Sequence, residues 1–270
     1  MAHEALPDRD ALLAWYAAVR RPLPWRATRD PYALLVSEVM LQQTQAARVV
    51  AYYEAFLARF PDAPALAAAP AREVLALWSG LGYNRRALAL QAAAQVVARD
   101  GWPADLTELP GVGSYTAAAV GAFAWQRDEA AVDTNVRRVI ERWDGTSLRA
   151  QALAERARQW LPRGRAADFN QAMMELGATV CAPRAARCGE CPLARGCASR
   201  GAPAVPRAGR RVRERFEDTD RWARGRVVAA LLAGEALPQA LGGERRERVL
   251  AGLERDGLVR RAADGSPALP

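Results

Sequence analysis

The amino-acid sequence predicts an all-α protein, and three observations support this prediction. Apolar residues recur at steps of three and four through most of the chain, which is the pattern of amphipathic helices. Proline and glycine stand in the breaks between these stretches. No run of alternating polar and apolar residues precedes residue 200. With 270 residues, of which 51% are hydrophobic and 25% charged, the chain can bury one large core or two modest ones.

The first half of the chain contains five helical stretches separated by short breaks. They cover residues 10–19, 32–60, 71–80, 85–99 and 114–125. Prolines interrupt the pattern at positions 61, 70 and 103, and glycines at 80, 82, 111 and 113 mark turns. We therefore expect a series of amphipathic helices from residue 8 to about residue 126.

A second helical set covers residues 134–143, 149–161 and 168–181, and with the first it forms an expected domain of residues 1–200. Residues 201–218 are rich in Pro, Gly and Arg, which is typical of a linker. The remaining module, 219–270, contains two helical stretches and a hairpin that turns at Asp264-Gly265. A winged helix has this order of elements, and so have other small α+β modules.

The formal charge of +8 and the pI near 10 favour a polyanionic partner. All 38 basic residues are arginine. A GC-rich genome explains this bias, and its chemical consequence is that no lysine side chain can form a Schiff base. The longest apolar run, Tyr115 to Trp125, is too short to cross a membrane, and no secretory signal is visible. We therefore expect a cytoplasmic protein.

All four cysteines lie within 17 residues, as Cys181, Cys188, Cys191 and Cys197. Because disulfides are reduced in the cytosol, this cluster indicates a metal site. A four-thiolate zinc site and an iron–sulfur cluster both use such ligands. Structural zinc usually has its ligands in two close pairs, whereas here a single Cys-x2-Cys pair is flanked by lone cysteines. The spacing by itself leaves both possibilities open.

The stretch LPGVG, residues 109–113, precedes the helix expected at 114–125. Helix N-termini expose unpaired N–H groups and a partial positive charge, which favour bound phosphate. Glycines at 111 and 113 would let a phosphate oxygen approach the amides of Gly111, Val112 and Gly113, and would permit positive φ angles. The alternative is an ordinary turn between helices, capped by Ser114. The basic charge and the cysteine cluster favour DNA phosphate.

Two carboxylates are candidates for chemistry. Glu38 lies within a helical stretch among apolar residues, so it faces solvent, lies at a polar seam, or has a pKa raised by burial. Asp133 directly precedes the helix expected at 134–143, where an aspartate is a natural N-cap. An acid paired with a carboxylate is also the arrangement that hydrolyses glycosidic bonds. Capping and catalysis by Asp133 are compatible.

Several segments in order along the chain carry a resemblance to a known family. They are LPWR at 23–26, SEVMLQQTQ at 37–45, GLGY at 80–83, LPGVG with an aspartate 20 residues beyond it, FNQAMMELGA at 169–178, and Cys-x6-Cys-x2-Cys-x5-Cys. The pattern resembles the helix–hairpin–helix DNA glycosylases. Among them it is most similar to the adenine DNA glycosylases of the MutY family, which remove adenine mispaired with 8-oxoguanine or guanine. The resemblance covers about residues 10–200.

The resemblance implies a fold and a cofactor. It implies a helix–hairpin–helix glycosylase fold with a six-helix barrel at about residues 28–133. A second subdomain, from about residues 8–27 and 134–200, would hold a [4Fe–4S] cluster on the four cysteines.

It also implies a mechanism. Glu38 would donate a proton to N7 of adenine, so that the base leaves in neutral form. Asp133 would stabilise the positively charged sugar, and Asn135 would orient water or that carboxylate. Tyr115 stands where strand-cleaving relatives such as endonuclease III carry a lysine, so water would be the nucleophile. We therefore expect base removal without cleavage of the strand.

Five further residues gain expected roles in substrate binding from the same resemblance. Gln42 and Tyr83 match positions that wedge into the base stack when a base is pulled out. Trp25, Arg26 and Gln171 would line the adenine pocket, where the amide of Gln171 can read the base. The alternatives are a solvated Gln42 and core positions for Tyr83 and Trp25.

The C-terminal region departs from the family pattern. Most members carry a Nudix-type domain that reads 8-oxoguanine, and residues 198–270 are too few for one. The arginines at 207, 210, 211, 213 and 215 would add charge to this region. Asn84 also replaces the aromatic residue that commonly follows Tyr83. These departures weaken the expected preference for 8-oxoguanine over guanine opposite adenine.

Two other functions stay open on the sequence. One is a related glycosylase that acts on thymine opposite guanine, and the other is a non-catalytic, cluster-bearing DNA-binding regulator. Gln171 and the LQQTQ segment favour adenine, and the presence of both Glu38 and Asp133 favours an enzyme. The expected partner is double-stranded DNA with an adenine mispair, bound by a monomer in a bacterial cytoplasm.

Overall fold

A computed structural model of the chain describes residues 6–202, 215–238 and 241–270. Most of the expected linker, including the arginines at 207, 210, 211 and 213, lies outside the described residues. Within those residues the chain is helical apart from one two-stranded hairpin near the C-terminus, which confirms the predicted fold class. None of the described helices is long and apolar enough to cross a membrane.

The chain divides into two compact units. The first comprises Met1–Leu34 and Gly113–Ala208, and the second comprises Leu35–Val112 and Gly209–Pro270. One boundary therefore falls within α2 (Pro31–Leu41), and another lies just before α7 (Ser114–Trp125). The functional domains expected from the sequence, a barrel at about 28–133 and a cluster subdomain, have other boundaries and stay a prediction.

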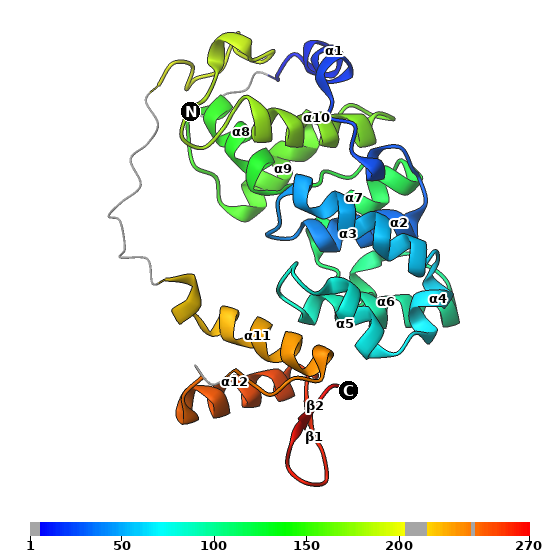
Figure 1. The fold of residues 1–270 in the computed structure, drawn as a ribbon. Helices are drawn as coiled ribbons and strands as arrows, with labels where there is room; N and C mark the ends of the chain where they lie inside the picture. The colour runs from blue at the N-terminus through cyan, green and yellow to red at the C-terminus, as the bar shows by residue number, and fades with distance from the viewer. Residues whose placement is uncertain (1–5, 203–214, 239–240) are drawn as a thin grey trace. The chain divides into compact units, whose positions relative to one another are not determined.

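The first unit is built around α10 (Ala166–Thr179), which packs against α1, α7 and α8 (Figure 1). Its other helices are α1 (Arg9–Val19), α7, α8 (Thr134–Asp144) and α9 (Ala150–Trp160), and it also contains the short 3-10 turns η1 (Pro24–Arg26) and η3 (Cys188–Glu190). Trp143 of α8 and Trp160 of α9 meet edge to face in its core, with ring centroids 5.7 Å apart. Cysteines 181, 191 and 197 pack against the same core. The core therefore supports residues 181–197, the cysteine segment.

The second unit contains the end of α2 together with four helices, α3 (Ala46–Arg59), α4 (Ala63–Ala68), α5 (Ala71–Trp78) and α6 (Arg85–Asp100), and a 3-10 turn, η2 (Leu106–Glu108). Helix α4 packs along α6, and the rings of Phe56, Phe60 and Trp78 meet edge to face inside. Sequence analysis missed α4, whose start is marked by the Asp62 N-cap and a proline in its first turn.

The helical stretch expected at 32–60 is wrong as a single element. It is two helices, α2 and α3, separated by residues 42–45. Gln43 has φ 57° in this break, a left-handed conformation that an α-helix does not contain. Apolar periodicity continues across the break, so the pattern alone did not reveal the turn.

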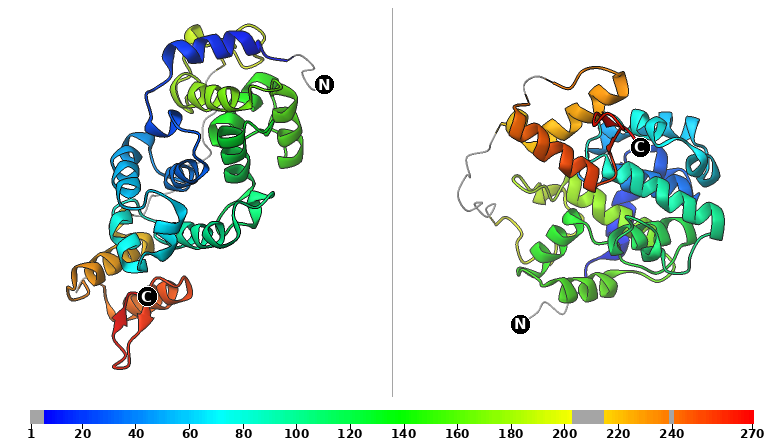
Figure 2. Two further views of the ribbon diagram at one scale, coloured as in Figure 1. Left: turned by 90° about the vertical axis from the view of Figure 1, so that its right-hand side faces the viewer. Right: turned by 90° about the horizontal axis from the view of Figure 1, so that it is seen from below.

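The C-terminal module belongs to the second unit and has the predicted order of elements. It consists of a 3-10 turn, η4 (Phe216–Asp218), two helices, α11 (Asp220–Ala233) and α12 (Gly243–Arg255), and the antiparallel strands β1 (Arg260–Arg261) and β2 (Pro267–Ala268). Figure 2 shows the hairpin following α12 from two further directions. Gly265 turns the hairpin with φ 81°. Its classification as a winged helix stays a prediction.

Candidate active site

Asp133 is the N-cap of α8, and its carboxylate is held by three N–H donors. Oδ1 accepts from the backbone N–H groups of Asn135 and Val136, at 2.8 and 2.7 Å. Oδ2 accepts from the side-chain amide of Asn135 at 2.7 Å. The capping alternative of the sequence analysis is therefore correct, and the same contacts fix the carboxylate in one orientation at the positive end of a helix.

Asn135 in turn connects Asp133 to the cysteine segment through Arg138. The Arg138 guanidinium donates to Asn135 Oδ1 at 2.8 Å, to Gly177 O at 2.6 Å and to Cys181 O at 2.8 Å. Burial lowers the pKa of Arg138, although nearby Cys181 and Asp133 favour its charged form. Sequence analysis missed Arg138, which stands one helical turn after Asn135 and so lies on the same face of α8.

Helix α10 approaches the start of α8 closely at Gly177. A β-carbon at Gly177 would lie 2.6 Å from Cβ of Asn135, which leaves no room for a side chain. Nearer the start of α10, Asn170 accepts from Ala131 N–H at 3.0 Å and donates to Glu129 O at 2.8 Å. Two residues of the FNQAMMELGA motif thus hold the segment that carries Asp133 and Asn135.

The residues expected in the adenine pocket lie in the first unit. Trp25 is 6% exposed in η1, as the core alternative expects. Arg26 donates to Glu175 Oε2 of α10 at 2.6 Å, and Gln171 Oε1 accepts from Tyr16 Oη at 2.6 Å. The Gln171 oxygen is therefore partly used within the protein, and its amide N–H groups are the donors that it can offer a base.

Glu175 is the centre of a charged cluster that sequence analysis missed. Its side chain is 1% exposed and receives hydrogen bonds from Arg21, at 2.7 and 2.9 Å, and from Arg26. Burial alone would raise the pKa of this carboxyl, but the two arginines outweigh it and hold the pKa below its ordinary value. No local pattern relates these residues, because about 150 positions separate them in the chain.

Tyr115 lies in the first turn of α7 and is partly buried beside Met174 of α10, with 4.0 Å between Oη and Sδ. Gly113, and not Ser114, is the N-cap of this helix, so the Ser114 cap considered for the sequence is wrong. Gly113 has φ −92°, and no atom of the described chain lies within 4 Å of an added β-carbon. The protein's own packing therefore does not require a glycine there.

In the same motif, Gly111 has φ 75°, and an added β-carbon would lie 2.7 Å from Cβ of Ala89. A glycine is required at position 111 because of its left-handed backbone conformation and its close packing against Ala89. Positive φ is thus present at Gly111 but not at Gly113. Val112 is buried and donates its N–H to Leu109 O at 3.1 Å.

Glu38 lies on α2 in the second unit and is 4% exposed, so the solvent-facing alternative is wrong. The turn that follows α2 is held by Arg86 of α6. The Arg86 guanidinium donates to the carbonyls of Val39 and Gln42 at 2.7 Å each, and to Gly82 O at 3.0 Å. Burial lowers the pKa of Arg86 to about 10. Arg86, which sequence analysis missed, joins the Gln42 turn to the Tyr83 turn.

Tyr83 is 37% exposed, so it is not a core residue. Its φ of 51° is left-handed, which is costly for a residue other than glycine and is often found at functional sites. The two turns and α11 border a groove of about 610 Å³. The loop residues that line it include Gln42, Gln43, Tyr83, Asn84, Arg85 and Arg86.

The four cysteines line one pocket of about 340 Å³ in the first unit, and none of them forms a disulfide. Burial raises the pKa of the Cys191 thiol to about 11 and also raises that of Cys197, and the neighbouring cysteines add to both shifts. Arg142 donates to Cys181 Sγ at 3.3 Å and to Ala182 O at 2.9 Å. Among the described residues, no three His, Cys, Asp or Glu side chains form a group that could hold a single metal ion.

Comparisons with known proteins agree with this architecture. A family profile described as HhH-GPD superfamily base excision DNA repair protein matches residues 36–163. The chain is 44% identical to an adenine DNA glycosylase of Mycobacterium tuberculosis over 96% of its own length and 92% of the relative's. It is 41% identical to human adenine DNA glycosylase, over 73% of this chain and 40% of the human one.

Solved structures place the fold in the same group. A thermostable thymine-DNA glycosylase matches 70% of this chain and 93% of its own, with a TM-score of 0.66 and 35% identity. Endonuclease III in a non-covalent DNA complex matches with a TM-score of 0.61 and 23% identity, which shows a shared fold. The fold and the profile thus define a DNA glycosylase of base excision repair. Within that class, the chain belongs to the adenine DNA glycosylase family.

Proposed function

We propose that the protein hydrolyses the N-glycosidic bond of adenine mispaired with 8-oxoguanine or guanine, acts as a monomer on double-stranded DNA, and leaves the strand intact. The observation that carries the proposal is the Asp133 carboxylate, which three N–H donors hold at the start of α8. A fixed negative charge stabilises positive charge that develops on the sugar as the bond breaks.

Glu38 is the proposed acid. Departure of a neutral adenine requires a proton on the base, and a carboxylic acid can supply it. Glu38 is buried, as expected of an acid in a site from which water is excluded. Water then adds to the sugar carbon once the glycosidic bond has broken, and its released proton passes to the solvent. Asn135, which already binds Asp133, is suited to orient that water or to keep the carboxylate in place.

Substrate binding involves two sets of residues in this proposal. Trp25, Arg26 and Gln171 bind adenine, and Gln42 and Tyr83 enter the base stack. The amides of Gly111, Val112 and Gly113 bind phosphate, and the open space beside Gly113 supports this role.

We also propose that the four cysteines hold a [4Fe–4S] cluster. All four cysteines line one pocket, and four thiolates around a shared space are the ligands of such a cluster. Bound there, a cluster would supply folding energy to residues 181–197, while Arg142 and Arg138 tie this segment to α8.

The second candidate is removal of thymine opposite guanine, which the 35% identity to a thymine-DNA glycosylase structure favours. Single-turnover base release distinguishes the two. The substrates are duplexes with A opposite 8-oxoguanine, A opposite G, A opposite T, and T opposite G, each analysed with and without alkali. We expect adenine release from the first two duplexes and strand breaks only after alkali. Thymine release alone would replace the proposal with the second candidate, and no release from any duplex would overturn both.

A further inference from the structure

The C-terminal module contacts the other part of the second unit, residues 35–112, through side chains of α5 and α6. Arg72 of α5 donates to Leu232 O near the end of α11 at 2.5 Å. Arg85, at the start of α6, lies 3.7 Å from Asp256, the residue after α12. Asp256 also binds Arg224 of α11. These contacts hold the first turns of α11 beside the turn between α5 and α6, which carries Tyr83.

Arg221, in the first turn of α11, stacks on Tyr83. Its guanidinium carbon lies 4.0 Å from the centre of the Tyr83 ring, and Arg86 lies 5.5 Å from the same centre. The Arg221 side chain also passes Gly82, where an added β-carbon would lie 3.5 Å from Nη2. A cation at this distance from an aromatic ring attracts it. The Tyr83 ring thus contacts two arginines, one from each part of the second unit.

Positive and negative charges nearly balance within the module. Residues 215–270 contain ten arginines and nine acidic side chains, so the module adds little to the net charge of +8. Several of these arginines are neutralised in ion pairs: Arg224 with Asp256, Arg248 with Asp220, and Arg261 with Glu247 and Glu254. Within the part of the chain that the structure describes, Arg221 forms no ion pair, as is true of five other arginines of the module. A balanced surface is poorly suited to bind DNA by charge alone.

We propose that Arg221 is a positioning residue for Tyr83, and that the module contributes to DNA engagement by holding this tyrosine in its left-handed conformation. The proposal rests on the proposed function, in which Tyr83 enters the base stack. Preorganisation lowers the cost of ordering a side chain on binding, so the benefit of Arg221 belongs to affinity for the mispair and not to the chemical step.

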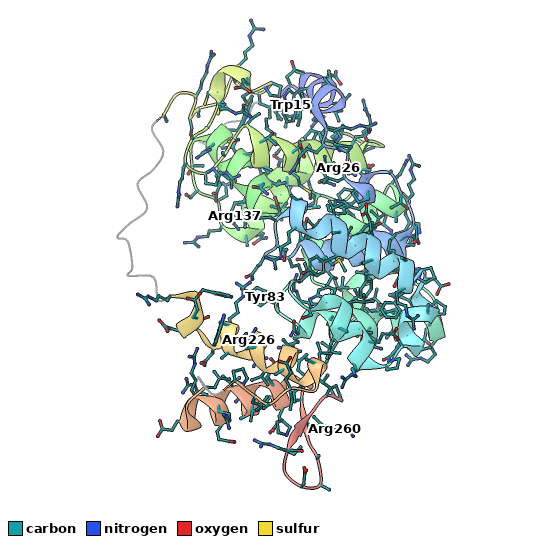
Figure 3. The ribbon with its side chains drawn as sticks, in the orientation of Figure 1. Trp15, Arg26, Tyr83, Arg137, Arg226 and Arg260 are labelled. Atoms are coloured by element: carbon teal, nitrogen blue, oxygen red, sulfur yellow. The ribbon has the colours of Figure 1, made fainter. Side chains whose placement is uncertain are left out.

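The test compares Arg221→Ala and Arg221→Lys with Arg226→Ala, which removes the same charge from an exposed position on the same helix (Figure 3). The probe is a duplex with a cleavage-resistant 2′-fluoro adenosine analogue opposite 8-oxoguanine, and its affinity is measured by fluorescence anisotropy. We expect Arg221→Ala to weaken binding about 3- to 5-fold, within the range of a cation–π contact at an exposed site, and Arg221→Lys to retain most of the affinity. Arg226→Ala should match wild type within about twofold, as expected for an exposed charge.

Arg221 must act through Tyr83, and a double-mutant cycle tests this requirement. In the Tyr83→Ala background, Arg221→Ala should have no further effect on affinity. The single-turnover release rate at saturating enzyme should stay unchanged in Arg221→Ala, so that the loss appears in binding alone. An equal loss in both backgrounds, or a loss equal to that of Arg226→Ala, would show that Arg221 acts only as a charge and would overturn the proposal.

A measurement without DNA separates failure of this proposal from failure of the proposed function. The full chain is labelled with 3-fluorotyrosine, and Tyr83→Phe assigns the fluorine resonance of Tyr83. Arg221→Ala should shift that resonance and Arg226→Ala should not. An unmoved resonance overturns the positioning role even if adenine is released. A moved resonance and a coupled loss of affinity support the role even if no base is released.

Discussion

At the scale of a single residue, Asp133 caps α8, and in the proposed function the same carboxylate also stabilises positive charge on the sugar. As N-cap it satisfies two backbone N–H groups of α8, and its remaining oxygen is bound by the Asn135 amide. Asparagine caps helices as well as aspartate does, but it carries no charge. The two tasks can therefore be separated by one substitution.

We expect Asp133→Asn to lower the single-turnover rate of adenine release by at least about 100-fold, because the stabilising charge is lost. The free energy of unfolding should fall by only about 1–2 kcal/mol, because the cap is kept and only the hydrogen bond from the Asn135 amide is lost. Asp8→Asn, at the equivalent cap of α1, is the control and should leave the rate unchanged. Normal adenine release by Asp133→Asn would remove Asp133 from the mechanism.

Glu38 is tested by the nearly isosteric change Glu38→Gln. The amide cannot donate an acidic proton to adenine, so we expect the release rate to fall on the order of 10²–10⁴. Affinity for the uncleaved duplex should stay within a few-fold, because shape and burial are preserved. Release at the wild-type rate in a single turnover would show that another group protonates the base.

The buried carboxylate of Glu175 should make the stability of the folded protein depend on pH. Its pKa is lowered in the folded protein, so its contribution is complete above the unfolded value near 4.5 and is lost as the pH falls through the lower, folded value. We expect Glu175→Gln to destabilise by about 2–4 kcal/mol at pH 7, where it leaves Arg21 and Arg26 without their carboxylate. The difference from wild type should shrink below pH 4.5. Thermal unfolding from pH 7 to pH 3 measures this, and the exposed Glu155→Gln is the control.

At the scale of elements, the contact between α8 and α10 sets the position of Asp133. Gly177 lets α10 approach Asn135, and Arg138 spans from Asn135 to Gly177 O and Cys181 O. The cap of α8, the body of α10 and the start of the cysteine segment are therefore one connected arrangement. A shift of one of these elements is expected to move the others.

Gly177→Ala tests this arrangement. Alanine favours a helix over glycine by about 1 kcal/mol, but here its methyl group would lie 2.6 Å from Cβ of Asn135. We expect a net loss of about 1–3 kcal/mol in stability from overpacking, and a fall in the release rate as Asn135 moves.

The matched control is Gly225→Ala on α11, where an added β-carbon meets no atom of the described chain within 4 Å. This variant should be as stable as wild type or more so. If Gly177→Ala had the stability and the release rate of wild type, α10 would be able to shift away from Asn135 without disturbing the site.

At the scale of the whole molecule, the absence of lysine limits the chemistry of the entire chain. An amine of a lysine side chain would be needed to form an imine with the opened sugar and to break the strand by that route. We expect borohydride to trap no covalent enzyme–DNA adduct during adenine release. Gel analysis should show nicks only after alkali. A trapped adduct would show that another amine of the chain attacks the sugar.

The sequence alone was sufficient for the family and the helical class, and it singled out two carboxylates whose catalytic roles stay predictions. Motifs such as LPGVG and the cysteine spacing are local, and so is helical periodicity, because each follows from neighbours within a few positions. Even the N-cap role of Asp133 follows from its place before a periodic stretch. The break at residues 42–45 escaped detection because its cause is not local: Arg86, more than 40 positions away, binds the carbonyls there.

Only the tertiary structure decided which residues support the site. The Glu175 cluster joins positions about 150 residues apart, and the stack of Arg221 on Tyr83 joins two segments that no pattern relates. Tertiary structure also decided that Glu38 is buried and that Tyr83 is exposed. Periodicity assigns a residue to a face of its own helix, whereas burial and pairing depend on what the folded chain brings against that face.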